Sequence, residues 1–229
     1  MDYQDTIYNA IDKYSARIES AENAEDIPQL FDEAWSDFEN LWLEGSKLPG
    51  NETACEAGCV YCCHYTVSLR AHEVAQVLEH ILKNFTKAEI KEVVKRAKQN
   101  RTRMKKLTHE QIEHTNIKCP LLSDEGLCRC YEVRPLNCRR NNSRDIDLCR
   151  AFHENPESDL MADSAKDIDH LTSTIGYALN EAFSQNGYDD SIYYLNHALY
   201  EGLLRPRTIT RWHKKKKAFS RAAESKEFD

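Results

Sequence analysis

Residues 55–63 read Cys55-Glu-Ala-Gly-Cys59-Val-Tyr-Cys62-Cys63, and this stretch decides what kind of fold the chain can adopt. Four thiols within nine residues are too closely spaced to be core positions of a helix or a strand. Thiolates at such spacing are typical ligands of zinc or of an iron–sulfur cluster. All nine cysteines of the chain lie between positions 55 and 149. The sequence therefore predicts a metal site in the middle of the chain.

The second part of the cysteine pattern lies between Cys119 and Cys149. Residues 119–122 read Cys-Pro-Leu-Leu, and residues 128–139 read Cys-Arg-Cys-Tyr-Glu-Val-Arg-Pro-Leu-Asn-Cys-Arg. The order C-x3-C-x2-CC, then C-P-aliphatic-aliphatic, then C-x-x-Y-x-x-R-P-x-x-C-R resembles the CxxCxxCC family of zinc- or iron-chelating proteins, also called YkgJ-like. The resemblance covers about residues 50–150. It implies a small intracellular metal-binding domain.

Eight of the nine cysteines are the candidate metal ligands. The family has an aliphatic residue before the tyrosine, where this chain has Cys130, so we leave Cys130 out of the set. Eight thiolates make two sets of four, which fits two tetrathiolate sites or one cluster with one single-metal site. We expect the adjacent Cys62 and Cys63 to serve different metals, or one of them to pack beside the site. The candidate ligands are Cys55, Cys59, Cys62, Cys63, Cys119, Cys128, Cys138 and Cys149.

The ligand count does not identify the metal, because Zn²⁺ and a cubane iron–sulfur cluster each take four thiolates. Residues 55–62 also fit C-x3-C-x-aromatic-C, the cluster loop of radical S-adenosylmethionine enzymes, with Tyr61 as the aromatic residue. The repeated strand–helix units of those enzymes are not recognisable here. The loop spacing shows that a cubane could be held, and we favour an iron–sulfur cluster over zinc. His64 and His153 are alternative ligands beside the thiols.

Three other residues near the cysteines have two interpretations each, and a fourth has one. Arg134 and Arg139 could place guanidinium donors near thiolate sulfurs, or they could form ion pairs or a helix cap. Glu73 stands at the usual acidic position of the family, but it could equally be an ordinary exposed helix residue. Tyr131 is predicted to be a core residue.

The N-terminal residues have no basic start and no apolar stretch, so the sequence predicts no signal peptide. No run of eighteen apolar residues occurs, and we expect no membrane association. A cytoplasmic location keeps thiols reduced, which argues against disulfides. A redox-sensing thiol pair remains an alternative.

Apolar periodicity predicts an all-α fold, with one mostly helical domain over residues 1–229 and a cysteine core at 50–150. Seven glycines and six prolines are few for a strand-and-turn architecture. A capping box at Thr86 and Glu89 predicts the start of a helix, and Asp189 or Asp190 is expected to begin another. Apolar residues repeat at three and four positions within 7–18, 30–42, 74–82, 168–183 and 192–203.

Charge is unevenly distributed. Residues 1–57 hold fourteen acidic against three basic residues, whereas residues 205–221 hold eight basic residues and no acid. The basic tail could bind nucleic acid, but the net charge of −7 favours pairing with the acidic N-terminal helices or with a protein partner.

No motif of a known catalytic mechanism is present. We therefore interpret the chain as a metal-stapled binding or redox module. The alternatives are a cluster-dependent enzyme that modifies a protein or small molecule, and a nucleic-acid-binding zinc protein.

Overall fold

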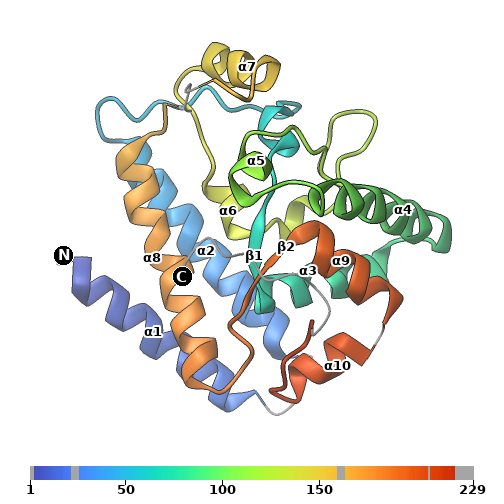
Figure 1. The fold of residues 1–229 in the computed structure, drawn as a ribbon. Coiled ribbons are helices and arrows are strands. Elements are labelled where there is room, and N and C mark those ends of the chain that lie inside the picture. The colour runs from blue at the N-terminus through green and yellow to red at the C-terminus, as the bar shows by residue number, and fades with distance from the viewer. Residues whose placement is uncertain (1–2, 22–25, 159–162, 206, 220–229) are drawn as a thin grey trace.

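A computed structural model describes residues 3–21, 26–158, 163–205 and 207–219, which form a mostly helical fold (Figure 1). The prediction of an all-α architecture is thus confirmed. The α-helices are α1 (Tyr3–Ser20), α2 (Ile27–Ser46), α3 (Ala71–Asn84), α4 (Lys87–Met104), α5 (His109–Glu113), α6 (Leu136–Arg140), α7 (Ile146–Glu154), α8 (Lys166–Gln185), α9 (Leu195–Leu204) and α10 (Arg207–His213). Two 3₁₀ helices, η2 (Tyr61–His64) and η3 (Tyr131–Val133), and two strands, β1 (Ser68–Arg70) and β2 (Ile192–Tyr194), complete the elements.

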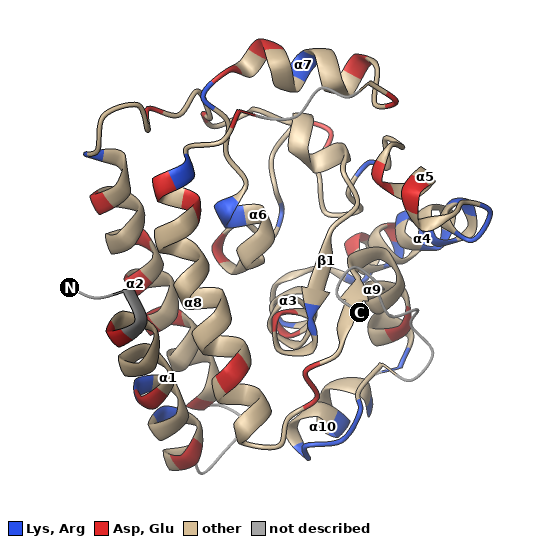
Figure 2. Ribbon diagram, turned by 60° about the vertical axis from the view of Figure 1, so that its left-hand side comes forward, with Lys and Arg blue, Asp and Glu red and all other residues tan. Residues whose placement is uncertain are grey.

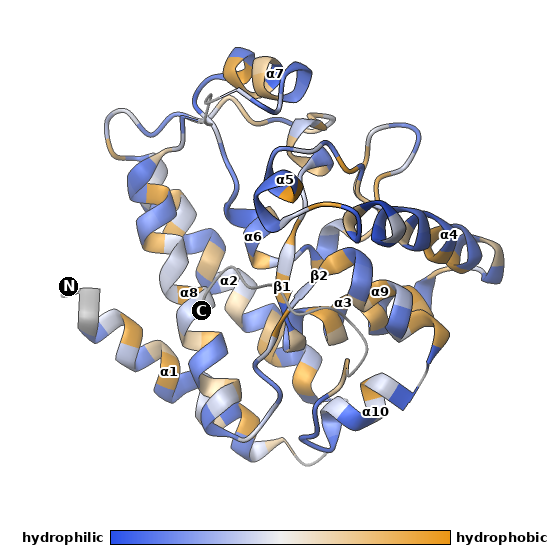
Figure 3. Cartoon of the chain, viewed as in Figure 1, coloured by the Kyte–Doolittle hydropathy of each residue, from blue (hydrophilic) through white to orange (hydrophobic). Residues whose placement is uncertain are grey.

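Helices α1, α2 and α8 form one layer of the molecule, with α8 lying against both of the others (Figure 1). The predicted apolar stripes are the buried faces, and Figure 3 shows them turned toward the neighbouring helices. Tyr14, Ala34 and Ala178 are completely buried. Burying such a stripe is the main source of stability for a surface helix. The layer is therefore held by apolar packing.

Helix α3 is the centre of the fold. It follows β1, packs against α9 and α10, and buries residues on nearly every side, including Val74, Val77 and Leu78. Helix α4 covers α9 from the outside. Its predicted capping box is confirmed: Thr86 Oγ1 accepts from the Glu89 amide at 3.3 Å, and the Glu89 carboxylate accepts from the Thr86 amide at 2.7 Å.

The two strands were not predicted. Ser68–Arg70 pairs antiparallel with Ile192–Tyr194, with Leu69 opposite Tyr193. Ile192 therefore belongs to a strand rather than to the predicted helix, which begins at Leu195. Asp189 does not cap that helix: its carboxylate accepts from the Ser191 amide and the Tyr193 hydroxyl. Strands of three residues are too short to show the alternating pattern of a sheet.

The candidate ligands lie in two stretches, residues 54–65 and 117–154, which we call the cysteine loops. They contain mainly irregular backbone and the short elements η2, η3, α6 and α7. Helix α6 is set against α8 where Gly176 has no side chain: a Cβ there would lie 2.0 Å from Leu136 Cδ2. This close approach fixes α6, and with it Cys138, on the three-helix layer.

Acidic side chains are frequent on α1, α2 and α8, and basic ones on α4 and α10 (Figure 2). The four exposed lysines at 214–217 form a turn between the buried residues Trp212 and Ala218. The described tail contacts α3, α8, α9, β2 and the turn before β2. His213 Nε2 lies 2.6 Å from Glu79 Oε1, and the Ala218 amide donates to Asp189. Arg221 lies outside the described residues. No helix in the described ranges is both long and apolar enough to cross a bilayer.

Candidate metal centre

Backbone hydrogen bonds join the two cysteine loops. The Cys119 amide donates to the Cys63 carbonyl at 2.8 Å, and the Ile117 amide donates to the His64 carbonyl at 2.7 Å. These two bonds lay residues 117–119 alongside the end of η2. Cys63 and Cys119 are 56 positions apart in the chain, yet they become neighbours through this pairing.

A tight turn brings Cys128 back to Cys119. Leu122 forms an isolated antiparallel bridge with Cys128, and the Arg129 amide donates to the Leu121 carbonyl at 3.0 Å. The turn needs a left-handed residue, which Gly126 supplies with a φ of 79°. The spacing from 119 to 128 is therefore that of a small hairpin with a cysteine at each end.

Cys138 lies on α6, and the buried Glu73 holds the start of that helix. The Glu73 carboxylate accepts from the Leu136 amide at 2.7 Å and from the Arg70 amide at 2.9 Å. The Asn137 side chain donates to the Ser68 carbonyl at 2.9 Å. Glu73 is only 5% exposed, so its interpretation as an ordinary exposed helix residue is wrong. Burial raises its pKa, and the two amides oppose that rise.

Cys55 and Cys149 are held by the segment that follows α6. The Ser143 amide donates to Cys55 Sγ at 3.4 Å, and the Ala54 amide donates to the Ser143 carbonyl at 2.8 Å. Two residues later Asp145 caps α7, accepting from the amides at the start of that helix. Helix α7 lies against η2 and carries Cys149. The first and last cysteines of the set are thus brought to the same end of the molecule.

The electrostatics of the thiols divide them into two groups. The first group is Cys55, Cys59, Cys62 and Cys149. Burial raises the pKa of Cys55, and negative charge at the other three would raise it further. The same is true of Cys59 with respect to Cys62 and Cys149. Charges influence one another in this way only when they are close.

The second group is Cys63, Cys119, Cys128 and Cys138. Burial raises the pKa of Cys119 to about 12, and charge at Cys128 adds to the rise. Burial raises the pKa of Cys138 well above its ordinary value, with charges at Cys119, Cys62 and Cys128 adding to it. The pKa of Cys63 is raised chiefly by its hydrogen bond to Cys62, and also by burial and charge at Cys119 and Cys138.

Cys62 connects the two groups. Its pKa is lowered to about 6, first by the hydrogen bond from the Cys63 thiol, and also by a hydrogen bond with Asn141 and the positive charge of Arg134. The hydrogen bond between the adjacent thiols therefore favours the thiolate on Cys62 over the thiolate on Cys63.

Two arginines lie near the second group. The charge of Arg134 lowers the pKa of Cys128 and opposes the rise for Cys138, although burial is the larger cause at both thiols. Arg134 Nε is buried without a hydrogen-bond partner. Arg139 donates to the Arg134 carbonyl at 2.7 Å and stacks 4.5 Å from the centroid of Trp35. Both guanidinium groups are therefore placed to offset negative charge on the sulfurs.

Cys130 and Tyr131 occupy opposite environments. Cys130 is completely buried in the main apolar core, against which Cys119 and Cys128 pack, and charge at these two thiols adds to the rise that burial causes in its pKa. Tyr131 is 62% exposed and lies under Arg134, whose guanidinium carbon is 4.6 Å from the ring centroid. The prediction of Tyr131 as a core residue is wrong, because the preceding residue, Cys130, occupies the core position instead.

His64 and His153 face each other beside the first group, with ring centroids 4.6 Å apart. His64 Nδ1 lies 3.1 Å from the Val60 carbonyl, and His153 Nδ1 is buried without a partner. Tyr61 packs against His153 and receives a hydrogen bond from Arg150. The two imidazoles form part of the wall around the first group.

The donor set suits a thiophilic metal. All nine cysteines are free, and eight of them converge from four segments of chain, with guanidinium groups nearby. Across the described ranges, no three Cys, His, Asp or Glu side chains are already arranged tightly enough to hold an ion. Metal binding would therefore need the sulfurs in each group to move closer together.

Comparison with known families finds one match. Residues 54–158 match the CxxCxxCC family, described as "Putative zinc- or iron-chelating domain". The resemblance given by the cysteine spacing is thus confirmed over these residues. Neither the curated proteins nor the solved structures contain a match to the chain.

Proposed function

We propose that this protein is a metal-binding module that uses eight of its cysteines as ligands, because residues 54–158 match the CxxCxxCC zinc- or iron-chelating family and contain all eight candidate thiols. The observation that carries the proposal is that backbone hydrogen bonds join the two cysteine loops and that free thiols from these distant parts of the chain are electrostatically coupled. Cysteines of a helical core have no reason to gather in this way, and the completely buried Cys130 shows where a packing cysteine lies.

We further propose a division of the ligands. The first site takes Cys55, Cys59, Cys62 and Cys149, and the second takes Cys63, Cys119, Cys128 and Cys138. The coupling of Cys55 and Cys59 to Cys149, and of Cys63 to Cys119 and Cys138, supports this division, while Cys62 is coupled to thiols of both groups. We place the hydrogen-bonded neighbours Cys62 and Cys63 in opposite sites, because Cys62 is coupled to Cys55 and Cys59, whereas Cys63 is coupled to Cys119 and Cys138.

We favour an iron–sulfur cluster in the second site, with iron or zinc in the first. The second group has its thiols away from solvent, and Arg134 and Arg139 lie near it. Positive charge near the sulfurs favours the more negative reduced state and so raises a cluster's potential. This arrangement supports a redox or metal-stapled binding role in the reducing cytoplasm, with a protein as the partner.

Anaerobic purification followed by elemental analysis and visible absorption tests the metal. We expect about two metal sites per chain, with iron and acid-labile sulfide. A colourless protein with stoichiometric zinc would assign zinc to the sites. A fully folded protein with neither metal would overturn the proposal.

Single substitutions test the division. Cys149→Ser should empty the first site and Cys138→Ser the second, each removing roughly half of the metal. Cys130→Ser is the matched control and should leave the metal content unchanged, although a hydroxyl in the core lowers stability by about 1–3 kcal/mol. If Cys130→Ser lost as much metal as Cys138→Ser, the assignment of ligands would be wrong.

A further inference from the structure

A pocket lies on the α7 side of the first cysteine group. It has a volume of about 200 Å³ and is lined by residues from α5, α7, the start of β1 and the end of β2. Two walls come from residues 65–68 and from Phe152 of α7, which follow the candidate ligands Cys63 and Cys149 by only a few positions. Tyr194, in β2, lies outside the matched family segment. The pocket therefore joins the metal-binding segment to the C-terminal helices.

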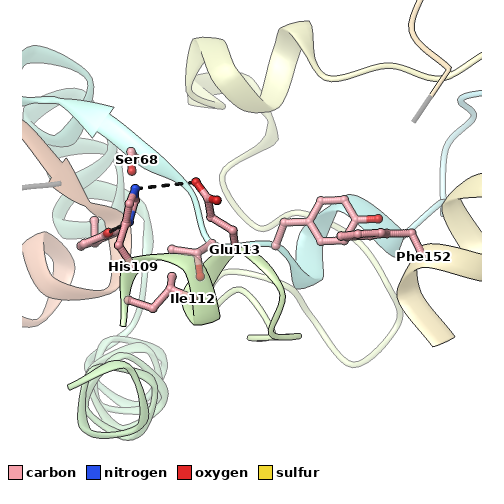
Figure 4. Close-up of a pocket in the computed structure, with 8 residues that line it drawn as sticks. Ser68, His109, Ile112, Glu113 and Phe152 are labelled. Atoms are coloured by element: carbon pink, nitrogen blue, oxygen red, sulfur yellow. Dashed lines mark hydrogen bonds and ion pairs between the residues drawn. The ribbon is translucent and has the colours of Figure 1, made fainter. Parts of the chain in front are cut away.

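One side of the pocket is aromatic. The rings of Tyr65 and Phe152 meet edge to face with centroids 5.2 Å apart, and Ile112 lies across from them. Figure 4 shows Phe152 reaching in from α7, opposite His109. Aromatic faces of this kind accept apolar groups and attract cations.

The other side of the pocket is polar and carries a carboxylate. Glu113 lies between His109 and Phe152 (Figure 4), with its side chain about half exposed. His109 Nε2 is 3.6 Å from Glu113 Oε1, and His109 Nδ1 is 2.8 Å from the Tyr194 hydroxyl. When the His109 ring carries its proton on Nε2, its Nδ1 accepts a hydrogen bond from the Tyr194 hydroxyl, and its Nε2–H points toward the Glu113 carboxylate.

The polar side also offers an unused acceptor. Thr66 is one of the lining residues, and its Oγ1 is buried without a hydrogen-bond partner in the described structure. Glu113 is the single acidic residue of the lining. The lining contains no lysine or arginine, so no permanent cation among these residues pairs with Glu113. A bound molecule that donates hydrogen bonds would satisfy both groups.

From this lining we propose that the pocket binds a small organic ammonium ion with an apolar substituent. The charged nitrogen would lie at Glu113 with Thr66 as a further acceptor, and the apolar part would contact Tyr65 and Phe152. An anion would meet the Glu113 carboxylate, and a purely apolar molecule would leave Thr66 unpaired. The inference goes beyond the proposed metal binding and does not depend on which metal is bound.

Titration of the metal-loaded protein with benzylammonium at pH 8 tests the proposal, with chemical shifts of the Ile112 methyl group as the local readout. Benzyl alcohol has the same shape without the charge, and we expect it to bind about tenfold more weakly. Glu113→Gln should weaken benzylammonium by about tenfold and leave benzyl alcohol nearly unchanged.

Glu110→Gln is the matched control, because Glu110 lies on the same helix, is exposed and does not line the pocket. It should change the affinity by less than about twofold. Equal binding of the alcohol and the ammonium ion would overturn the proposal. So would equal losses in the two variants, or no shift of Ile112 at about 10 mM ligand. Metal content, measured on the same samples, reports separately on the cysteine sites.

Discussion

The three-helix layer and the cysteine loops are stabilised by different kinds of interaction. In the layer, α1, α2 and α8 are 18–20 residues long and bury continuous apolar faces. In the loops, α6 has five residues and α7 nine, and neither contains a fully buried residue. The layer is stabilised by apolar packing. The loops bury fewer apolar side chains, chiefly Ile117, Leu121 and Leu122, so their thiols and hydrogen bonds contribute more to holding them, and metal is the natural cross-link.

Removal of the metal should show the contrast most strongly. We expect amide protection to fall across residues 54–65 and 117–154 and to persist in α1, α2 and α8. The reason is that structural metal sites contribute about 10 kcal/mol or more of folding free energy. Hydrogen exchange on loaded and stripped protein measures this. Equal protection of the loops in the two samples would mean that metal does not hold them.

A core substitution in the layer should have the converse effect. Phe183 is completely buried and stacks with Phe31 and the ring of His72. Phe183→Ala should lower the free energy of unfolding by about 3–5 kcal/mol and leave the metal content unchanged. Leu43→Ala, at a position 57% exposed on α2, should cost less than about 0.5 kcal/mol. Denaturant unfolding and elemental analysis check both variants; parallel loss of metal and stability would erase the distinction.

A pH dependence should appear at His72, where α3 meets the layer. Burial lowers its pKa to about 3, and the charge of Arg70 contributes. In the unfolded chain His72 binds a proton near pH 6.5, whereas in the folded chain it stays neutral down to about pH 3. The contribution of His72 to the free energy of unfolding therefore falls as the pH drops from 6.5 toward 3. At pH 5 the loss is about 2 kcal/mol.

The control for this dependence is His72→Phe, which keeps an aromatic ring between Phe31 and Phe183. Stability of the two proteins is compared at pH 7.5 and pH 5. Glu73 has a raised pKa, so its contribution to the free energy of unfolding falls as the pH rises. Because Glu73 is present in both proteins, this contribution cancels in the difference between them. If the variant loses as much stability as the parent protein, His72 does not titrate as expected.

The smallest effect is expected at the turn after α10. Lys215 has a φ of 55°, a left-handed conformation that a side chain disfavours. Lys215→Gly should raise the free energy of unfolding by about 0.5–1 kcal/mol. Lys216→Gly, with no such conformation to relieve, should not raise it. Thermal unfolding distinguishes the two, and equal effects would show that the turn is not strained.

The long elements of the layer could be predicted from the sequence, but the arrangement of the site could not. Periodicity at residues 7–18 and 30–42 is a local property, and so is the capping box at Thr86. The grouping of Cys149 with Cys55 and Cys59 depends on α7 lying against η2, a contact between residues about ninety positions apart. Spacing identified the candidate ligands without showing which of them are neighbours.

Three residues show why local patterns failed. Glu73 looks like a solvated helix residue, but its partners are backbone amides at 70 and 136. Tyr131 is large and apolar enough for a core, yet Cys130 took that place. Ile192 fits a helical stripe, but it pairs with Arg70 in a strand. In each case a contact distant in sequence overrode a local preference.

The placement of α8 against α1 and α2 has a consequence for synthesis on the ribosome. Helix α2 ends at Ser46 and its main partner α8 ends at Gln185, so 139 residues separate the two events. At about 5–20 residues per second, the apolar faces of α1 and α2 wait roughly 7–28 s for their partner. During that time the cysteines have all emerged and can already meet metal. The nascent chain would then acquire its metal while its N-terminal helices still need protection from aggregation.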